Sequence, residues 1–244
     1  MSGHSKWHNI QARKGKQDAK KGNVFSKYAK KISIVAKTGG GNLDTNFTLR
    51  MLIEKARKEG MPKDNIDRAI KSGTGELKGV AQVEELMYEG FGPGGTAIMI
   101  KILSDNKNRT APEIKKILSD HGGSMGGAGS VQWMFQQWGV AEVEMSVLSE
   151  KGIKKEDLEM DLIEAGAEDI WEEEGMLEIK TKVENLHKLT DKLNALGIPV
   201  KDSGLRWIAK DRVVVDAVVT EKLQNLFSVL EEHDDVEDYY TNAE

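Results

Sequence analysis

Residues 84–103 read EELMYEGFGPGGTAIMIKIL, and this stretch decides the fold of the middle of the chain. Residues 96–103 form a mostly apolar, partly β-branched run, which is typical of a buried strand. The glycines before it match G-x-G-x-x-G, but a dinucleotide-binding turn requires a helix after the glycines. Because a strand pattern follows instead, we predict a hairpin of strands 84–89 and 96–103 and no nucleotide cofactor.

The segment after the hairpin predicts a helix, a flexible loop and a strand. The helix spans 109–121, the loop GGSMGGAGS spans 122–130, and the strand spans 131–135. The loop contains G-x-S-x-G, but a nucleophile elbow lies between a strand and a following helix, which is the opposite order. We therefore predict that the glycines let the chain reverse tightly and that Ser124 has no catalytic role.

Residues 139–203 carry the βαββαβ order of a ferredoxin-like unit. Its predicted elements are strands at 140–143, 170–171, 176–179 and 198–200, with helices at 155–165 and 183–196. The last segment predicts strands at 205–208, 213–215 and 236–240 and a helix at 220–232. Joined to the hairpin region, this last segment would complete a second α/β domain, with the ferredoxin-like unit inserted into it.

Residues 24–73 predict three short helices with apolar residues at helical spacing, each ended by glycine. Residues 2–21 have few apolar positions and predict an extended or loosely ordered arm. The fold class is therefore α+β with three domains. These are a basic helical domain with its arm at 1–79, a discontinuous α/β domain at 80–137 plus 204–244, and an inserted ferredoxin-like α/β domain at 138–203.

Positive charge is concentrated at the start of an acidic chain. The whole sequence has 35 Lys and Arg against 40 Asp and Glu, yet residues 1–37 have ten basic side chains and one acid. Residues 1–79 carry a net charge of +11 and residues 80–244 a net charge of −16. Such segregation predicts that the basic end attracts a polyanion while the remainder repels it.

Ten residues near the start are the candidates for contact with nucleic acid. Lysine and arginine would meet phosphate, and an indole could stack on a base, although Trp7 could equally anchor the arm to the body. The alternative for the lysines is an ordinary solvated helix face. The candidates are Lys6, Trp7, Arg13, Lys14, Lys16, Lys20, Lys21, Lys27, Lys30 and Lys31.

The sequence offers no motif for catalysis, a metal or a cofactor. It has no cysteine, and its five histidines form no H-E-x-x-H pattern. No Walker A sequence and no EF-hand loop is present. No apolar run approaches 18 residues, so we expect no membrane span. We predict a protein that is not an enzyme and holds neither metal nor cofactor.

Several ordered stretches resemble the YebC/PmpR family, which includes mitochondrial translational activators of cytochrome oxidase. The matching stretches are GHSKW (3–7), QDAKKG (17–22), MPKDNIDRAI (61–70), GTGE (73–76), YEGFGPGG (88–95), DNKNRT (105–110), HGG (121–123) and GSV (129–131). No single motif is diagnostic, but their order and spacing are specific. The C-terminal third matches the family in layout more than in wording.

The resemblance implies a cytoplasmic, non-enzymatic, three-domain protein that regulates gene expression. Members are usually described as DNA-binding transcriptional regulators, and this is the function we expect first. Others are described as translation factors that act on RNA or the ribosome, including relief of stalling at proline runs. A third hypothesis is an enzyme with a pocket between the α/β domains. Phosphate contact alone cannot separate DNA from RNA, and the sequence does not give the oligomeric state.

Overall fold

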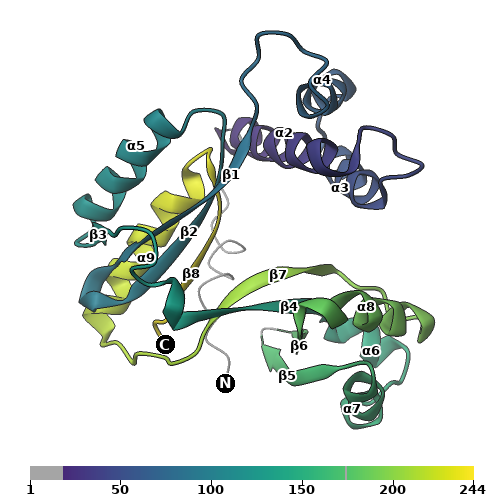
Figure 1. The fold of residues 1–244 in the computed structure, drawn as a ribbon. Coiled ribbons are helices and arrows are strands. Elements are labelled where there is room, and N and C mark those ends of the chain that lie inside the picture. Colours follow the sequence, from purple (N-terminus) through teal and green to yellow (C-terminus); the bar gives the residue numbers. More distant parts are fainter. Residues whose placement is uncertain (1–18, 174) are drawn as a thin grey trace. The chain divides into compact units, whose positions relative to one another are not determined.

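The computed structural model describes residues 19–173 and 175–244, which fall into two compact units (Figure 1). The described part of the larger unit comprises residues 19–131 and 215–239. The described part of the smaller unit comprises residues 132–173, 175–214 and 240–244. In the described part of the chain, no helix combines the length and the apolar character that crossing a membrane would require.

The described part of the larger unit begins with three helices, α2 (Ala19–Gly39), α3 (Phe47–Lys58) and α4 (Lys63–Gly73). Their shared core contains the fully buried side chains Ile32, Leu49, Ile53 and Ile66. The three helices predicted from the apolar spacing are thus confirmed.

Two local devices fix these helices relative to one another. The Asn46 side chain accepts a hydrogen bond from the Leu49 amide at 3.0 Å, which caps α3, and donates to the Gly40 carbonyl at 2.8 Å. Gly73 lies so close to α2 that a Cβ atom there would be 2.2 Å from the Ser33 carbonyl oxygen. The sequence thus favours α3 starting at residue 47 and permits close packing of α4 on α2.

A four-stranded sheet with the order β3-β1-β2-β8 follows in the same unit. Its strands are β1 (Glu84–Phe91), β2 (Ala97–Ser104), β3 (Ser124–Met125) and β8 (Val236–Thr241). The predicted hairpin is confirmed, because β1 and β2 pair antiparallel from Glu84↔Ser104 to Phe91↔Ala97. The turn between them holds Gly94 and Gly95 at φ of 72° and 73°, a conformation that favours glycine.

Two helices, α5 (Lys107–Asp120) and α9 (Ala217–Glu232), pack against each other in this unit. Their buried faces include Ile114 and Leu118 of α5 and Leu226 and Phe227 of α9. Both helices were predicted from sequence. The expected strand at 131–135 is wrong, because residues 132–134 form a 3-10 turn and the strand β4 starts at Phe135.

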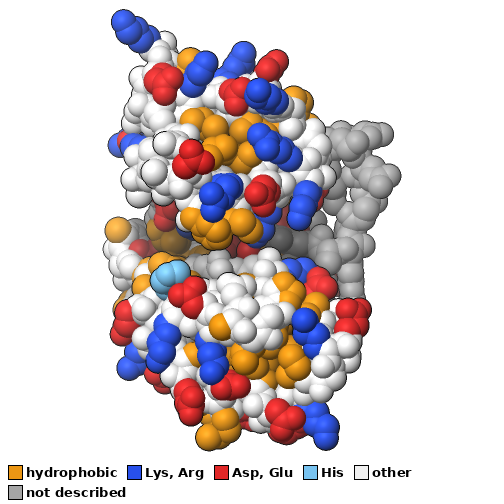
Figure 2. Space-filling model, turned by 90° about the vertical axis from the view of Figure 1, so that its right-hand side faces the viewer, with side chains coloured by type: hydrophobic (Ala, Val, Ile, Leu, Met, Phe, Trp, Pro, Cys, Tyr) orange, Lys and Arg blue, Asp and Glu red, His pale blue; other side chains and the backbone are white. Residues whose placement is uncertain are grey.

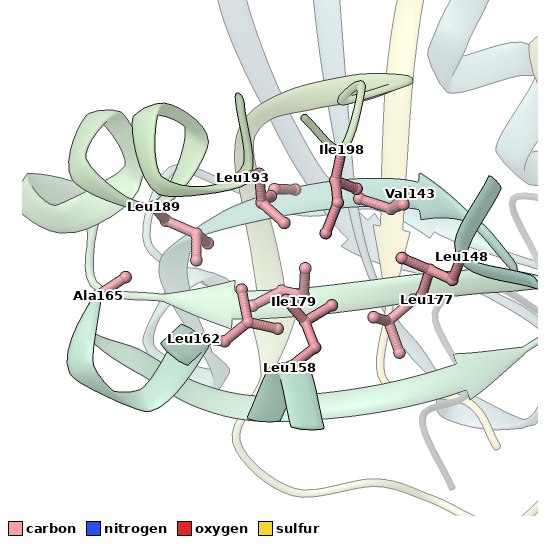
Figure 3. Packing of buried hydrophobic residues seen from close by; sticks show 11 residues of the cluster. Val143, Leu148, Leu158, Leu162, Ala165, Leu177, Ile179, Leu189, Leu193 and Ile198 are labelled. Atoms are coloured by element: carbon pink, nitrogen blue, oxygen red, sulfur yellow. The ribbon is translucent and has the colours of Figure 1, made fainter. Parts of the chain in front are cut away.

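The smaller unit contains a second sheet, with the order β5-β6-β4-β7. Its elements are β4 (Phe135–Glu144), α6 (Met145–Glu150), α7 (Lys155–Glu164), β5 (Ala167–Glu173), β6 (Met176–Thr181), α8 (Leu186–Ala195) and β7 (Asp202–Ala209). Figure 3 shows Leu162 of α7, Leu189 and Leu193 of α8, and Ile179 of β6 directed into one buried cluster. Helices and sheet therefore share one core, as the predicted βαββαβ pattern requires.

One predicted strand of this unit is wrong. Residues 198–200 form a loop, and the strand is β7, which pairs antiparallel with β4 from Phe135↔Ala209 to Glu142↔Asp202. The side chain of Ile198 is fully buried in the core of the smaller unit, which explains why this loop residue is apolar. Its amide donates to the Leu193 carbonyl at 2.9 Å, just after the end of α8. Residues 205–208, which we expected in the discontinuous domain, belong to β7. The division into three domains stays a prediction.

Candidate nucleic-acid interface

The predicted nucleic-acid residues divide into three groups. Five of them, Lys6, Trp7, Arg13, Lys14 and Lys16, lie outside the described residues. Lys20 and Lys21 belong to the first turn of α2. Only Lys27, Lys30 and Lys31 have side chains whose surroundings the structure describes, and all three contact one acidic stretch of the same unit.

That stretch is the segment EEHDDVED, residues 231–238, which we name the acidic segment. It spans the end of α9 and the start of β8 and contains six carboxylates. Asn23 of α2 donates to the Glu232 carbonyl at 2.8 Å, and the Lys27 ammonium donates to the Glu231 carbonyl at 2.8 Å. Burial lowers the pKa of Lys27, and the nearby Glu237 carboxylate only partly opposes this.

Lys30 makes the most buried of these contacts. Its ammonium donates to the Asp234 carbonyl at 2.8 Å and to the carboxylate of Asp235, whose side chain is only 1% exposed. The same carboxylate accepts from the Arg109 guanidinium at 2.8 Å and from the Thr110 hydroxyl at 2.5 Å. The Ser104 hydroxyl is a fourth donor at 3.3 Å, and a buried carboxylate with four donors is stable in its charged form.

The ionisation of Asp235 follows from this arrangement. Burial alone would raise the pKa of Asp235, but the hydrogen bonds from Lys30, Thr110 and Arg109 outweigh burial and lower it well below its usual range.

Lys31 pairs with Glu237 at 2.7 Å. Burial would lower the pKa of Lys31, whereas the Glu237 carboxylate raises it above its usual value. The Asp235 carboxylate and the Lys31 ammonium are therefore charged at neutral pH.

The lysine face of α2, formed by Lys27, Lys30 and Lys31, is thus covered by the acidic segment. These three lysines do not form an open basic surface, because their ammonium groups bind carboxylates and carbonyls of residues 231–237. Contact of these lysines with phosphate stays a prediction. The sequence analysis missed Asp235, although six acids in eight residues complement the charge of α2 and could have indicated the pairing.

Exposed cations lie on the other two helices instead. Arg50, Arg57 and Lys58 of α3 and Lys63, Arg68 and Lys71 of α4 are exposed. Within the described residues, no carboxylate lies within ion-pairing distance of Arg50 or Lys58. Figure 2 shows Lys and Arg side chains, with Asp and Glu among them, next to hydrophobic ones over this three-helix part of the larger unit. Unlike Lys27, Lys30 and Lys31, these cations are exposed on the surface of the three-helix region.

A shallow cavity of about 690 Å³ lies beside the buried carboxylate of Asp235. In this cavity the Asp235 amide donates a hydrogen bond to Nδ1 of His233 at 3.1 Å. The hydrogen of the neutral ring is therefore on Nε2, which donates to the Glu113 carboxylate at 3.2 Å. The lining as a whole is mixed in charge, with Lys30, Arg109 and Lys116 against five carboxylates, Asp235 and Glu113 among them. In the described part of the chain, no three His, Asp or Glu side chains converge as a metal site would require.

The glycine loop at 122–130 is held by one buried carboxylate. Glu89 of β1 accepts from the Gly129 amide at 2.6 Å and from the Val131 amide at 2.8 Å, while its own carbonyl accepts from the Gly126 amide at 2.8 Å. Ser124, which lies in β3, pairs with Phe91 of β1. The loop is therefore anchored to the hairpin, as a tight chain reversal requires.

The fold defines a class of α+β proteins with a helical N-terminal region and two four-stranded sheets, and comparison with known proteins identifies the family. The sequence model of the TACO1/YebC protein N-terminal domain matches residues 5–76, and that of the TACO1/YebC second and third domain matches residues 83–243. This chain belongs to the TACO1/YebC family.

Relatives of similar length support this assignment. The chain is 48% identical to a probable transcriptional regulatory protein of Dictyoglomus turgidum, over 99% of this chain and 95% of the relative. It is 45% identical to one of Thermotoga maritima, over 100% of this chain and 94% of the relative. A crystal structure of a conserved hypothetical protein from Aquifex aeolicus is similar with a TM-score of 0.82 and 38% identity, covering 95% and 93% of the two chains.

Proposed function

We propose that this protein is a non-enzymatic, cytoplasmic regulator of gene expression that binds DNA and controls transcription. The observation that carries the proposal is the net charge of +11 in residues 1–79 of an otherwise acidic chain. Such a charge distribution attracts phosphate and orients the protein on it. The relatives named as probable transcriptional regulatory proteins support the regulatory part.

We assign the first phosphate contacts to the arm and the start of α2. These are Lys6, Arg13, Lys14, Lys16, Lys20 and Lys21, with Trp7 beside them. Lys27, Lys30 and Lys31 would join only where phosphate displaces the carboxylates and carbonyls of the acidic segment. The exposed cations of α3 and α4 add to the arm without any such exchange.

A second candidate function is regulation of translation through RNA or the ribosome. The observation that favours it is the exposed ring of Phe47 beside the Arg50 guanidinium, because unpaired bases stack on such groups and are common in RNA. Crosslinking in cells followed by sequencing separates the two functions. Recovery of genomic DNA fragments would support the first, and recovery of messenger or ribosomal RNA would support the second.

Direct binding tests the shared premise. If six to eight phosphates are neutralised, the affinity for a 20-base-pair duplex should fall about 10³- to 10⁴-fold between 50 and 200 mM salt. Lys20→Glu with Lys21→Glu should weaken binding strongly, whereas Lys154→Glu with Lys155→Glu, the same change of charge in the smaller unit, should weaken it far less. Absence of binding to DNA, RNA and ribosomes at 50 mM salt would overturn the proposal.

A further inference from the structure

Helix α3 has an outer face that the packing of the domain does not explain. Its inner face buries Leu49, Ile53 and Ala56. On the outer face the Phe47 side chain is 63% exposed, and Met51, one turn later, is 41% exposed. A single exposed apolar residue needs no explanation, but two on adjacent turns form a patch.

Cations border this apolar patch. The Arg50 guanidinium carbon lies 5.1 Å from the centre of the Phe47 ring, and the Arg50 side chain is also tied to the Leu43 carbonyl at 3.5 Å. Lys58 follows eleven residues after Phe47, which places it on the same side of the helix about 16 Å away. The helix holds four basic residues and a single acid, Glu54.

We infer that this surface, formed by Phe47, Arg50, Met51 and Lys58 and here named the α3 face, binds an unpaired stretch of nucleic acid. Arg50 covers one side of the Phe47 ring, so a base stacks on the other side, with Met51 against its edge. Arg50 also meets the adjoining phosphate, and Lys58 meets a phosphate further along the strand. The inference rests on the proposed nucleic-acid binding and narrows its partner to unpaired nucleotides.

The need for unpaired nucleotides follows from geometry. In a duplex the faces of the bases are stacked on one another and cannot reach a side chain on a helix surface, whereas unpaired bases can splay out onto aromatic and guanidinium groups. The phosphates of a duplex remain accessible to Lys58 and Arg50. The α3 face should therefore distinguish single strands from duplexes through Phe47 and not through its charges.

The acidic surroundings of another exposed apolar pair provide a contrast. Met160 and Ile163 of α7 are 66% and 53% exposed, but this ten-residue helix contains five carboxylates and only one lysine. A polyanion would be repelled there. Ile163 is therefore a matched control for Phe47, because both are large, exposed and apolar on a helix surface.

The test is fluorescence anisotropy of the full chain with three labelled 20-nucleotide probes of one sequence: single-stranded RNA, single-stranded DNA and duplex DNA. We expect Phe47→Ala to weaken both single-stranded probes about 5- to 150-fold and the duplex less than twofold. Phe47→Trp, which keeps a stacking ring, should retain the affinity of the unsubstituted protein. Ile163→Ala should leave all three affinities unchanged.

The outcomes separate this inference from the proposed function. If the unsubstituted protein binds the probes but Phe47→Ala binds them equally well, the α3 face is not the site and the proposed function stands. Equal weakening on single strands and duplex would also overturn the inference, because it would make Phe47 a support of the fold; thermal unfolding would show this as a lower Tm. Failure of the unsubstituted protein to bind any probe at 50 mM salt would overturn both.

Discussion

Two basic helix faces in the same three-helix region have opposite surroundings. The lysine face of α2 meets the acidic segment, where Lys30 and Lys31 form ion pairs with Asp235 and Glu237. The α3 face carries cations of the same kind, yet among the described residues Arg50 meets a ring and a carbonyl and no carboxylate. The number of lysines in a segment therefore does not tell how many are available to a partner. That depends on which acidic residues the fold brings to them.

Removing the Asp235 carboxylate should have the largest effect on the covered lysine face of α2. Asp235→Ala leaves the largely buried Lys30 ammonium and the half-exposed Arg109 guanidinium without this acceptor, and we expect the free energy of unfolding to fall by about 3–5 kcal/mol. Urea unfolding at pH 7 measures this. The control is Asp120→Ala, which removes an exposed pair with Lys116 and should lower the free energy of unfolding far less, because solvent screens exposed pairs. Equal effects would mean that Asp235 is not the tie between α2 and the sheet.

The pH dependence of stability tests the charge state of the same carboxylate. The pKa of Asp235 in the folded protein is lowered, so its stabilising effect is present above the unfolded pKa of about 4 and is lost as pH falls through the lower folded value. We expect the urea midpoint of the unsubstituted protein to fall more steeply below pH 4 than that of Asp235→Asn. Parallel curves for the two proteins would contradict this.

The two faces should also differ in the salt dependence of binding. Removing one cation that neutralises a phosphate lowers the slope of log affinity against log salt by about 0.9 for a duplex. Arg50→Gln and Lys58→Gln should each lower the slope by about that amount. Lys31→Gln should leave the slope unchanged, because Glu237 already neutralises its charge. If Lys31→Gln behaves as Arg50→Gln does, nucleic acid displaces the acidic segment.

Removing the carboxylate that pairs with Lys31 should have a smaller effect, seen in the salt dependence of binding. Glu237→Gln frees the Lys31 ammonium, so we expect the salt slope to rise by up to about 0.9, the value for one further neutralised phosphate. The loss of this partly buried pair should lower the free energy of unfolding less than Asp235→Ala does. Glu150→Gln makes the same change of net charge in the smaller unit. Anisotropy titrations in which both variants bind more tightly by the same factor would show that net charge, not Lys31, is responsible.

Local patterns in the sequence predicted most of the helices and strands. Apolar spacing identified α2, α3 and α4, and the glycines at 90–95 identified the hairpin, because each of these signals lies within one element. The pattern failed at 198–200, where an apolar loop residue fills the core and resembles a strand. The sequence pattern also did not predict the ion pairs of the α2 lysines. Their carboxylate partners lie about 205 residues further along the chain, and local periodicity carries no information on such distant contacts.

The discontinuous larger unit has a consequence for the nascent chain. Asp235 is added 205 residues after Lys30, which at 5–20 residues per second is a delay of roughly 10–40 s. During that interval the nascent chain carries α2 without Asp235 and Glu237, the carboxylates that pair with Lys30 and Lys31 in the folded protein. A chain that stops before residue 231 would never acquire these carboxylates. Premature termination would therefore release a protein whose α2 lysines attract polyanions more strongly than those of the finished protein.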